Sequence, residues 1–560
     1  MVTSSLPLRL NRFSKFSPSN QWNFQIREAV SKHNPNQALL LFRQMKQNDI
    51  VPNNFIFIFI AKACAQLSNL KYSQMIHTHT VKSPFGSHIY VQTTMVDMYV
   101  KCDQLDYACS LFDEMTERDV ASWNAMLVGF AQKGFVNEVL RIFYEMRFAG
   151  IKGDAVTAMG LTQSVLEAKN LNLLKAVHSI GIQMGMDADI EVATTWISAY
   201  AKCSDLNFAE LVFYGIEQGL QTVVSWNSMI AGYANNGKVF DAVRFYKWMM
   251  LDGFRPDVST IVSLLSACAQ LEALLHGCGQ GGTLELGKWI DNYASSKGLR
   301  DNVMVCNALI DMYAKCGSIP DARELFLAMP ERTVVSWTAM IAGCALNGEF
   351  SEALDLFHQM VELGLWPNHV TFLAVLRACA HAGFLEKGWE CFNMMTEVYN
   401  INPGLDHYSC MADILGRRGK LKKALDFVQS MPIKPDAGIW GALLSACKIH
   451  HNIEIGEYVA HRLFELVPHV AAPYVEMANI YAFWGRWDGV AKIRSMMKCN
   501  NVNKFPGQSQ VHVNGKTCTF TVEDRDHPEG IVIYALLDCL TFQLKEKAYL
   551  PQFEEISQHE

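Results

Sequence analysis

The sequence predicts an all-α fold, a right-handed superhelical α-solenoid of about twelve helix-turn-helix units. The first observation is a recurring motif: residues 223–257 read VVSWNSMIAGYANNGKVFDAVRFYKWMMLDGFRPD. The same layout returns at 19–53, 120–154 and 334–368. The second observation is the spacing of the tryptophans in these four segments, which are Trp22, Trp123, Trp226 and Trp337. The intervals are 101, 103 and 111 residues, about three times 34, so each leaves room for two more units of solenoid size.

Each tryptophan unit predicts two helices joined by a turn. In residues 223–257, the segment 226–234 is a short apolar helix and 235–237 is a turn. The second helix carries apolar residues at i, i+3, i+4 and i+7, which are Ala242, Phe245, Tyr246 and Met249. Gly253 and Pro256 then end this helix.

Two other kinds of unit fill the intervals. One has an Ala-Cys or apolar centre, as in residues 54–84, and the other is shorter and carries MYVKC or MYAKC, as in 90–119 and 304–333. After the fourth tryptophan unit the two kinds follow once more. About twelve units therefore cover residues 19–436, at nearly 35 residues each. Units of this size bury their apolar faces against their neighbours and form a solenoid.

The order of a SWN unit, an ACA unit and a short MYAKCG...MPER unit resembles the plant PLS-class pentatricopeptide repeat (PPR) proteins. The resemblance covers nearly the whole chain. The tetratricopeptide repeat has a similar length, but its first helix carries W-x2-L-G-x2-Y, which these units lack. The resemblance implies that the protein binds single-stranded RNA with one repeat facing one base.

Base recognition would use polar side chains on the first turns of the first helices. An Asn amide offers both a donor and an acceptor to a base edge, and a Thr hydroxyl can act as either. The resemblance implies that the fifth residue of a unit selects the base together with the last residue. The matching pairs are Asn23 with Asn53, Thr93 with Asp119, Asn124 with Asp154, Thr194 with Thr222, Asn227 with Asp257, Asn307 with Thr333, and Thr338 with Asn368. The alternative is that these residues are helix caps or turn residues, which are often Asn, Asp or Thr.

The family's preferences translate these pairs into a base sequence. Asn/Asn implies C, Asn/Asp implies U, Thr/Asn implies A and Thr/Asp implies G. The ACA units leave gaps because their fifth residue is apolar, for example Ile58. The implied RNA is C. G U.. U. Y A, with an edited cytidine a few nucleotides beyond the last repeat.

The C-terminal part departs from the repeats. Residues 437–513 resemble the family's E motif, with two helical pairs that lack the Asn or Thr selector. Asn514 and Gly515 predict a two-residue turn between alternating strands, and 514–550 resembles the E+ motif, followed by a tail at 551–560. The family's usual Cys-Ser-Trp after the Pro-Gly is here the segment 508–510, Gln-Ser-Gln.

The catalytic form of the family continues into a zinc-dependent cytidine deaminase domain, which needs H-x-E and a later P-C-x-x-C. Here His527, Pro528 and Glu529 match H-x-E by their letters, but only Cys539 lies downstream and the chain has no C-x-x-C. Zinc needs three or four ligands. We therefore expect no enzyme activity, no cofactor and no metal site.

Composition limits the other possibilities. The net charge is −7, so RNA recognition must be local and cannot rest on bulk positive charge. The sixteen cysteines fall at recurrent repeat positions and are expected to be small buried residues in a reducing compartment. The longest apolar run, residues 55–61, is far below the roughly 20 residues that span a bilayer, so we expect no membrane segment.

One ACA unit, residues 258–302, is irregular. It is 45 residues long and contains the same phase twice, as CAQLEALLHG at 268–277 and CGQGGTLELG at 278–287. We interpret this as two units fused where a three-unit block was lost, and the alternative is a surface-loop insertion. If a block was lost, the base register downstream of this junction is in doubt.

The N-terminal residues 1–18 contain Arg9, Arg12 and Lys15, and no acidic residue precedes Glu28. This composition is typical of an organelle transit peptide, mitochondrial rather than chloroplast, although an untargeted tail is the alternative. The predicted function is an adaptor for C-to-U editing of organellar transcripts. Through residues 437–550 it would recruit a deaminase-bearing PPR protein or editing accessory factors. The alternatives are an RNA-binding factor for splicing, end protection or translation, and a protein-interaction scaffold of tetratricopeptide type.

Overall fold

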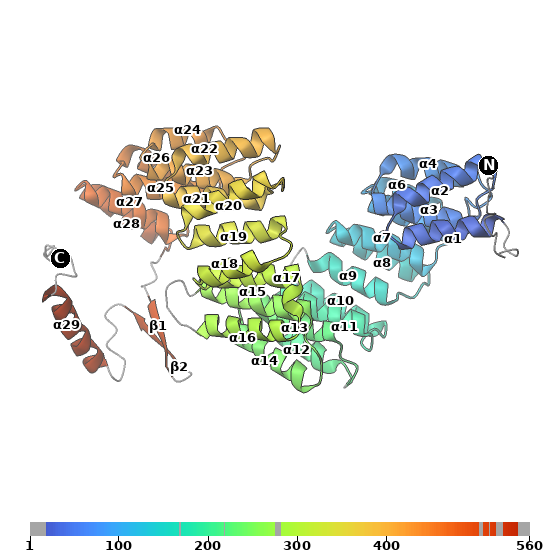
Figure 1. Ribbon diagram of the computed structural model, residues 1–560, viewed down its shortest axis with the longest axis horizontal. Helices are drawn as coiled ribbons and strands as arrows, with labels where there is room; N and C mark the ends of the chain where they lie inside the picture. The colour runs from blue at the N-terminus through green and yellow to red at the C-terminus, as the bar shows by residue number, and fades with distance from the viewer. Residues whose placement is uncertain are drawn as a thin grey trace, which may run out of the picture. The chain divides into compact units, whose positions relative to one another are not determined.

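The computed structural model describes residues 18–166, 170–217, 219–274, 282–502, 508–513, 516–521 and 530–546. The chain divides into two compact units, residues 1–360 and 361–560. In both units the described residues are almost entirely helical (Figure 1). The predicted leader at 1–18 lies outside the described residues except for Pro18.

The first unit consists of antiparallel helix pairs. Its helices are α1 (Pro18–Ser31), α2 (Pro35–Gln47), α3 (Asn54–Leu67), α4 (Leu70–Val81), α5 (Ile89–Lys101), α6 (Leu105–Glu114), α7 (Val120–Gln132), α8 (Val136–Phe148), α9 (Ala155–Leu166), α10 (Leu171–Gln183), α11 (Ile190–Lys202), α12 (Leu206–Gly215), α13 (Val223–Asn235), α14 (Val239–Leu251), α15 (Val258–Leu274), α16 (Gly282–Ser296), α17 (Val303–Lys315), α18 (Ile319–Ala328), α19 (Val334–Leu346) and α20 (Phe350–Glu362), which runs past the unit's last residue by two. A short 3₁₀ turn, Leu299–Asp301, precedes α17.

The second unit continues with pairs and ends in a hairpin and a helix. Its elements are α21 (His369–Ala382), α22 (Leu385–Asn393) with a π-helical turn (Met394–Val398), α23 (Leu405–Arg417), α24 (Leu421–Gln429), α25 (Ala437–Ile449), α26 (Ile453–Leu466), α27 (Ala471–Phe483), α28 (Trp487–Cys499), β1 (Gln508–Val513), β2 (Lys516–Thr521) and α29 (Gly530–Glu546). The strands pair antiparallel, with Val513 opposite Lys516. This confirms the predicted strand pairing, while the turn residues Asn514 and Gly515 lie outside the described residues.

The first helix of each pair forms a continuous layer. In the first unit, each odd-numbered helix from α1 to α17 packs against the next odd-numbered helix, ending on α19. In the second unit, α21, α23, α25 and α27 do the same. The even-numbered helices from α2 to α18 and from α22 to α28 each pack back on their own partner, so the helix pairs stack as a helical solenoid, as predicted.

Three of the four repeated tryptophans are core residues, and Trp22 is partly buried. Trp123, Trp226 and Trp337 are each 3% exposed and stand fourth in the first helix of a pair. Each meets, edge to face, a phenylalanine from the second helix of the preceding short unit. The ring centroids are 4.9 Å apart for Phe112 and Trp123, 4.7 Å for Phe213 and Trp226, and 4.9 Å for Phe326 and Trp337. This aromatic contact therefore fastens each short unit to the tryptophan unit that follows it.

Glycines allow the first helices to approach closely. A Cβ added at Gly232 in α13 would lie 2.8 Å from the Ala201 Cβ in α11, and one at Gly343 in α19 would lie 2.7 Å from the Ala314 Cβ in α17. Both distances are shorter than a carbon–carbon contact, so only glycine fits without moving a helix. Close packing of the first helices therefore requires a glycine at positions 232 and 343 of the tryptophan units.

Side chains in the turns tie consecutive pairs together at the edge where first helices end and second helices begin, which we call the turn edge. In the first unit, Asn236 donates through Nδ2 to the Ala201 carbonyl at 2.8 Å, and Asn347 donates to the Ala314 carbonyl at 2.7 Å. These bonds satisfy carbonyls that the helix C-termini leave without an intrahelical partner. They set the spacing between one pair and the next.

The irregular unit folds as one pair in its described residues. Helix α15 has 17 residues and α16 has 15, against 14 and 12 for α3 and α4 of a regular ACA unit. Helix α15 packs on α13 and on α17, so the layer of first helices continues through it. Part of the excess length therefore lengthens the two helices, and residues 275–281 between them lie outside the described residues.

Candidate nucleic-acid interface

The predicted fifth-position residues share one place in the fold. Six of them are the fifth residue of their helix: Thr93 in α5, Asn124 in α7, Thr194 in α11, Asn227 in α13, Asn307 in α17 and Thr338 in α19. Asn23, in α1, stands sixth. All seven therefore lie one turn into a first helix, on the element that builds the continuous layer.

Two of the predicted pairs form the same hydrogen-bonded group. Asn124 donates through Nδ2 to Asp154 Oδ1 at 2.8 Å, and the Thr157 hydroxyl lies 2.7 Å from Asn124 Oδ1 and donates to it. Asn227 and Asp257 repeat this at 2.9 Å, with Thr260 at 2.6 Å. Because an amide has two N–H bonds and two lone pairs, each Asn retains one further donor and one further acceptor.

The carboxylate of such a pair is held in its ionised form. Burial opposes ionisation of Asp257, but hydrogen bonds from the Thr260 backbone N–H, the Asn227 amide and the Thr260 hydroxyl outweigh it and lower the pKa of this carboxyl. Ionised Asp257 accepts hydrogen bonds only, which fixes the orientation of the Asn227 amide. The Asn227 side chain is 7% exposed, while the Asp257 residue is exposed at the surface above it.

The last residues of the units also cap helices, which was the alternative reading of these positions. The residues whose side chains accept from the first turn of the next helix are Asn53, Asp119, Asp154, Thr222, Asp257, Thr333 and Asn368. The fifth residues do not act as caps. Thr338 donates instead to the Val334 carbonyl at 2.7 Å, one turn back in its own helix. Thr338 belongs to the first unit and Asn368 to the second.

Three of the other fifth residues hold a polar atom without a partner. Among the described residues, Asn23 Oδ1, Thr93 Oγ1 and Asn307 Oδ1 are buried side-chain atoms with no hydrogen bond. A buried polar atom without a hydrogen bond lowers the stability of the folded state by about 1–3 kcal/mol, so its presence needs a reason other than folding. These three atoms are therefore better explained as hydrogen-bonding groups for a ligand than as parts of the core.

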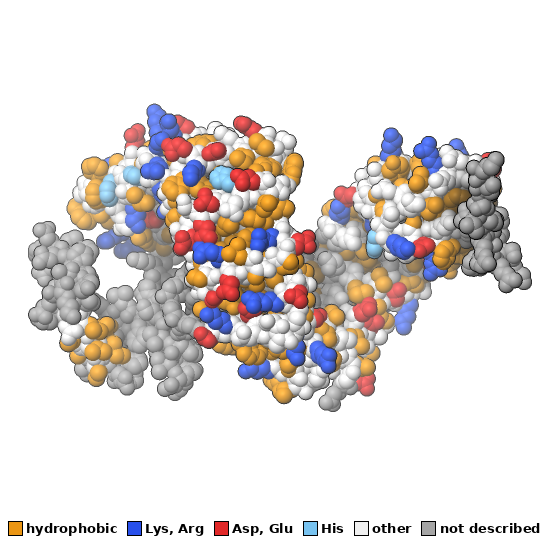
Figure 2. Space-filling model, in the orientation of Figure 1, with side chains coloured by type: hydrophobic (Ala, Val, Ile, Leu, Met, Phe, Trp, Pro, Cys, Tyr) orange, Lys and Arg blue, Asp and Glu red, His pale blue; other side chains and the backbone are white. Residues whose placement is uncertain are grey.

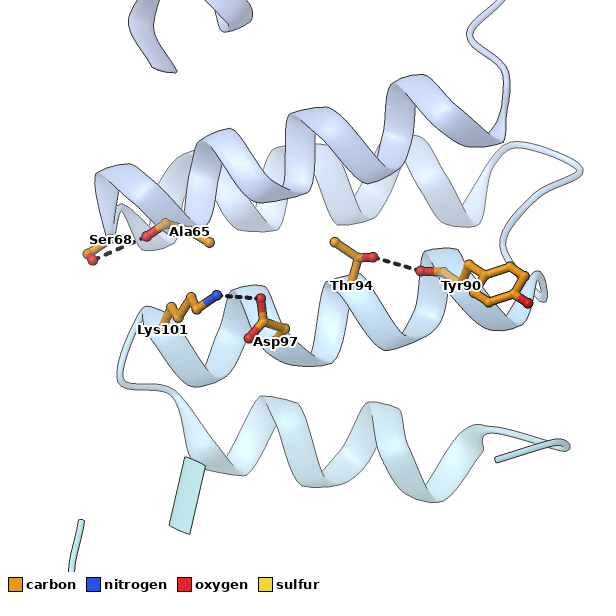
Figure 3. Close-up of polar contacts among 6 residues, drawn as sticks. All are labelled: Ala65, Ser68, Tyr90, Thr94, Asp97 and Lys101. Atoms are coloured by element: carbon orange, nitrogen blue, oxygen red, sulfur yellow. Dashed lines mark hydrogen bonds and ion pairs between the residues drawn. The ribbon is translucent and has the colours of Figure 1, made fainter. Parts of the chain in front are cut away.

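A row of exposed apolar side chains was missed by the sequence reasoning. The second residue of a first helix is exposed and apolar in six pairs of the first unit, namely Phe55, Tyr90, Val156, Val224, Met304 and Val335, and again at Val370 in the second unit. Each lies three residues before the fifth position, so one turn of helix puts both on the same side. Figure 3 shows the Tyr90 ring standing away from the first turn of α5. The signal was an apolar residue outside the core periodicity.

Cations end the first helices of the short units. Lys101, Lys202 and Lys315 are the thirteenth and last residues of α5, α11 and α17, and Arg417 has the same place in α23. Lys101 pairs with Asp97 at 2.7 Å one turn earlier (Figure 3), and Lys315 pairs with Asp311 at the same distance. Elsewhere acidic and basic side chains lie side by side, as Figure 2 shows over α16 to α19. The short units therefore carry single cations at the ends of their first helices and do not form a continuous basic surface.

The two pairs α25/α26 and α27/α28 keep the packing and lose the polar position. Trp440 and Tyr474 stand fourth in α25 and α27, and they are buried like Trp226. The fifth residues are Gly441 and Val475, which offer no side-chain hydrogen bond. The prediction that residues 437–513 carry no Asn or Thr selector at this place therefore agrees with where these residues lie in the two helices.

The same repeats and the same C-terminal region are found in known proteins. A family model described as PPR repeat family matches residues 221–270 and 332–381, and one described as PPR repeat matches 93–120, 121–151, 304–334, 370–398 and 406–434. A third, the E motif, matches 450–512. A mitochondrial pentatricopeptide repeat-containing protein of Arabidopsis thaliana is 47% identical over 634 aligned positions, covering 97% of each chain. The chain belongs to the PPR family.

Other comparisons agree with this membership. A chloroplastic PPR protein of Arabidopsis thaliana is 36% identical and aligns with 95% of this chain and 64% of its own length. The crystal structure of PPR10 in complex with an 18-nucleotide psaJ RNA element superimposes with a TM-score of 0.57 at 16% identity, over 86% of this chain and 74% of PPR10. At that identity the likeness concerns the fold alone.

The alignment with the mitochondrial relative contains gaps in this chain. Its 634 positions exceed the 560 residues of this chain by 74, so the relative has at least 74 residues where this PPR protein has none. That is more than two units of about 35 residues. The relative is therefore longer than this chain within the aligned region.

The cysteines of the ACA units are core residues. Cys64, Cys268 and Cys379 of the ACA units are fully buried. Burial raises the pKa of the Cys64 and Cys268 thiols to about 12, so both are protonated at neutral pH. No helix within the described ranges has the length and apolar character needed to cross a bilayer. The H-x-E segment at 527–529 lies outside the described residues.

Proposed function

We propose that this PPR protein is a sequence-specific single-stranded RNA-binding adaptor for C-to-U editing of organellar transcripts. Its repeats would select the RNA, and residues 437–550 would recruit a deaminase in trans. The proposed base-selecting residues are the seven fifth residues and the seven last residues of the pairs defined above. The protein would act in mitochondria, where its 47% identical relative is named as residing, with the chloroplast as the alternative.

The observation that carries this proposal is the repeated Asn/Asp group. Asn124 with Asp154 and Asn227 with Asp257 hold their amides in one orientation, and each keeps a donor and an acceptor. A uracil edge presents one N–H donor flanked by carbonyl acceptors, so it can complete both hydrogen bonds. Single-stranded RNA exposes such edges, because its bases are unpaired.

Two further features support a single strand as the ligand. The exposed second residues, such as Tyr90 and Val224, are placed to lie against the faces of successive bases, which favours unstacked RNA. The cations that end α5, α11 and α17 can meet backbone phosphates one at a time, and Lys101 and Lys315 would exchange a weak surface ion pair for the phosphate. PPR10, which has the same fold, was crystallised with an RNA element.

The binding test uses the implied RNA C. G U.. U. Y A and a version with the assigned positions scrambled. We expect the protein to shift the first RNA in a gel at concentrations where the second stays free. Equal binding to both would overturn the assignment of selectors. A variant with Asn124→Ala and Asn227→Ala, compared with Asn235→Ala at the end of α13, separates loss of base reading from loss of folding.

The editing role needs a separate experiment. In plants that lack the protein, mitochondrial and plastid RNA is sequenced for cytidines that stay unedited. Loss of editing at one or a few sites preceded by the implied bases supports the adaptor role. Intact editing with altered splicing or transcript ends would instead favour the alternative RNA-processing function. If the unedited sites match the implied bases only for the repeats before residues 268–287, the register of repeats against bases changes at that junction.

A further inference from the structure

The turn edge of the last two helix pairs carries exposed aromatic rings. Phe483, Trp484 and Trp487 are 59%, 57% and 67% exposed, and they lie at the junction of α27 and α28. The His451 ring, from the preceding turn, stacks on Phe483 with centroids 3.4 Å apart and planes 4° apart. Trp484 donates through Nε1 to the His451 carbonyl at 2.6 Å. We call His451, Phe483, Trp484 and Trp487 the aromatic platform.

The platform continues the row of cations at the ends of the first helices. The thirteenth residue is Arg417 in α23, Ile449 in α25 and Phe483 in α27, so the charged position becomes apolar and then aromatic. Hydrogen bonds join these turns: His450 lies 3.2 Å through Nε2 from the Arg417 carbonyl and donates to it. The platform is therefore fixed next to the cation that ends the last repeat.

The surroundings of the platform are basic. Arg418, Lys420 and Lys448 are exposed on the same edge. Arg486 pairs with Glu457 at 3.5 Å, and Arg417 pairs with Asp413 at 2.8 Å, so these two cations are already partly neutralised. Glu454 and Asp488 are the exposed acidic residues in the adjacent first turns. In a chain of net charge −7, a local excess of cations around flat exposed rings is complementary to a polyanion with aromatic bases.

We propose that the aromatic platform binds the unpaired RNA that follows the segment read by the repeats, by stacking one or two bases on its rings. This rests on the proposed function, because it requires RNA to run along the repeats. A strand whose phosphates follow the helix-ending cations leaves the last of them at Arg417 and meets the platform next. Stacking tolerates any base, since every base has a π face, so this contact would add affinity without adding sequence preference.

The experiment compares two RNAs with the full chain, measured by fluorescence anisotropy. One RNA ends at the last nucleotide of C. G U.. U. Y A, and the other continues for about six arbitrary nucleotides. We expect the longer RNA to bind about tenfold more tightly, since stacking contributes about 1–3 kcal/mol per base. We also expect 2-aminopurine placed in the extension to lose fluorescence on binding.

The variant Trp487→Ala combined with Phe483→Ser should bring the longer RNA to the affinity of the shorter one and leave the shorter one unchanged. Trp366→Ala is the control, since Trp366 is 72% exposed in the same unit but away from the platform. Circular dichroism checks that each variant is folded. If wild-type protein binds both RNAs equally, or if the double variant keeps the tenfold gain, the proposal is wrong.

Two other outcomes are separable. If the wild type binds neither RNA, the proposed function fails before the platform is tested. If the double variant keeps all RNA affinity but loses capture of a deaminase or accessory protein, the platform is a protein-docking face, which overturns the RNA proposal.

Discussion

The tryptophan units and the last two helix pairs use the same core for different surfaces. Trp226 in α13 and Trp440 in α25 both stand fourth in a first helix and are buried. One residue later the two regions differ, because Asn227 carries an amide and Gly441 carries no side chain. At the turn edge, Asn236 and Trp484 each donate to a backbone carbonyl of the preceding pair, but Trp484 also presents a ring that is 57% exposed.

This comparison distinguishes the residues that pack the helices together from the residues that the surface presents to a ligand. A buried aromatic fourth residue and a turn hydrogen bond to the preceding pair occur in both regions, whereas the close-packing glycines Gly232 and Gly343 belong to the tryptophan units. The fifth residue and the thirteenth residue vary between regions at no cost to the packing. A repeat protein can therefore change its ligand contacts one position at a time.

The largest expected effect is on the shared core. Trp226→Ala and Trp440→Ala should each destabilise their unit by about 3–5 kcal/mol, because a buried aromatic is replaced by a cavity. Trp484→Ala should cost less than about 1 kcal/mol, since that ring is exposed. Urea unfolding followed by circular dichroism measures all three. Equal losses at Trp226 and Trp484 would contradict the distinction between core and display.

Glycine substitutions should differ in sign between the regions. Gly232→Val should destabilise by about 1–3 kcal/mol, because its Cβ would lie 2.8 Å from the Ala201 Cβ. Gly441→Ala should stabilise by up to about 1 kcal/mol, since a Cβ there meets no atom within 4 Å and alanine favours a helix. Thermal unfolding of both variants tests this, and a stabilised Gly232→Val would contradict the packing account.

An apolar second residue should add affinity without selectivity. Phe55→Ala removes an exposed ring from an ACA unit, whose own fifth residue, Ile58, is apolar. We expect about a fivefold loss of RNA affinity, the lower end of what one stacked base contributes. Because no selector changes, the ratio between cognate and scrambled RNA should stay constant. Anisotropy titrations with both RNAs check this, and a changed ratio would mean that Phe55 reads sequence.

The smallest effect concerns the cap. Asp257→Ala should cost about 1 kcal/mol of stability, because the side chain caps α15 as well as holding Asn227. Its pKa is lowered in the folded protein, so this stabilisation is present above the ordinary carboxyl pKa near 3.8 and is lost as pH falls below it. Urea unfolding at pH 7 and at about pH 3 should show the wild type and the variant converging in acid. A difference that persists at low pH would exclude the carboxylate as the source.

Sequence reasoning predicted the pairs of helices, the order of units and the strand pairing, because these follow from apolar periodicity and turn residues. It also predicted which residues stand at the fifth and last positions. It did not predict the exposed second residues, because Val224 and Met304 are apolar like the core residues near them and differ from these only in their place in the helical period. Nor did it predict that Trp484 is exposed while Trp440 is buried, since both follow an apolar run and only the packing of the turns distinguishes them.

The central claim is that a fifth residue and a last residue together read one base. The most direct test is the double variant Asn227→Thr, Asp257→Asn, which gives this unit the pair found at Thr338 and Asn368. Two RNAs are compared that differ only at the seventh nucleotide of C. G U.. U. Y A. The wild type should prefer U over A by about tenfold, and the variant should prefer A over U, since one well-placed pair discriminates by about 1–3 kcal/mol. An unchanged preference for U in a folded variant would contradict the account.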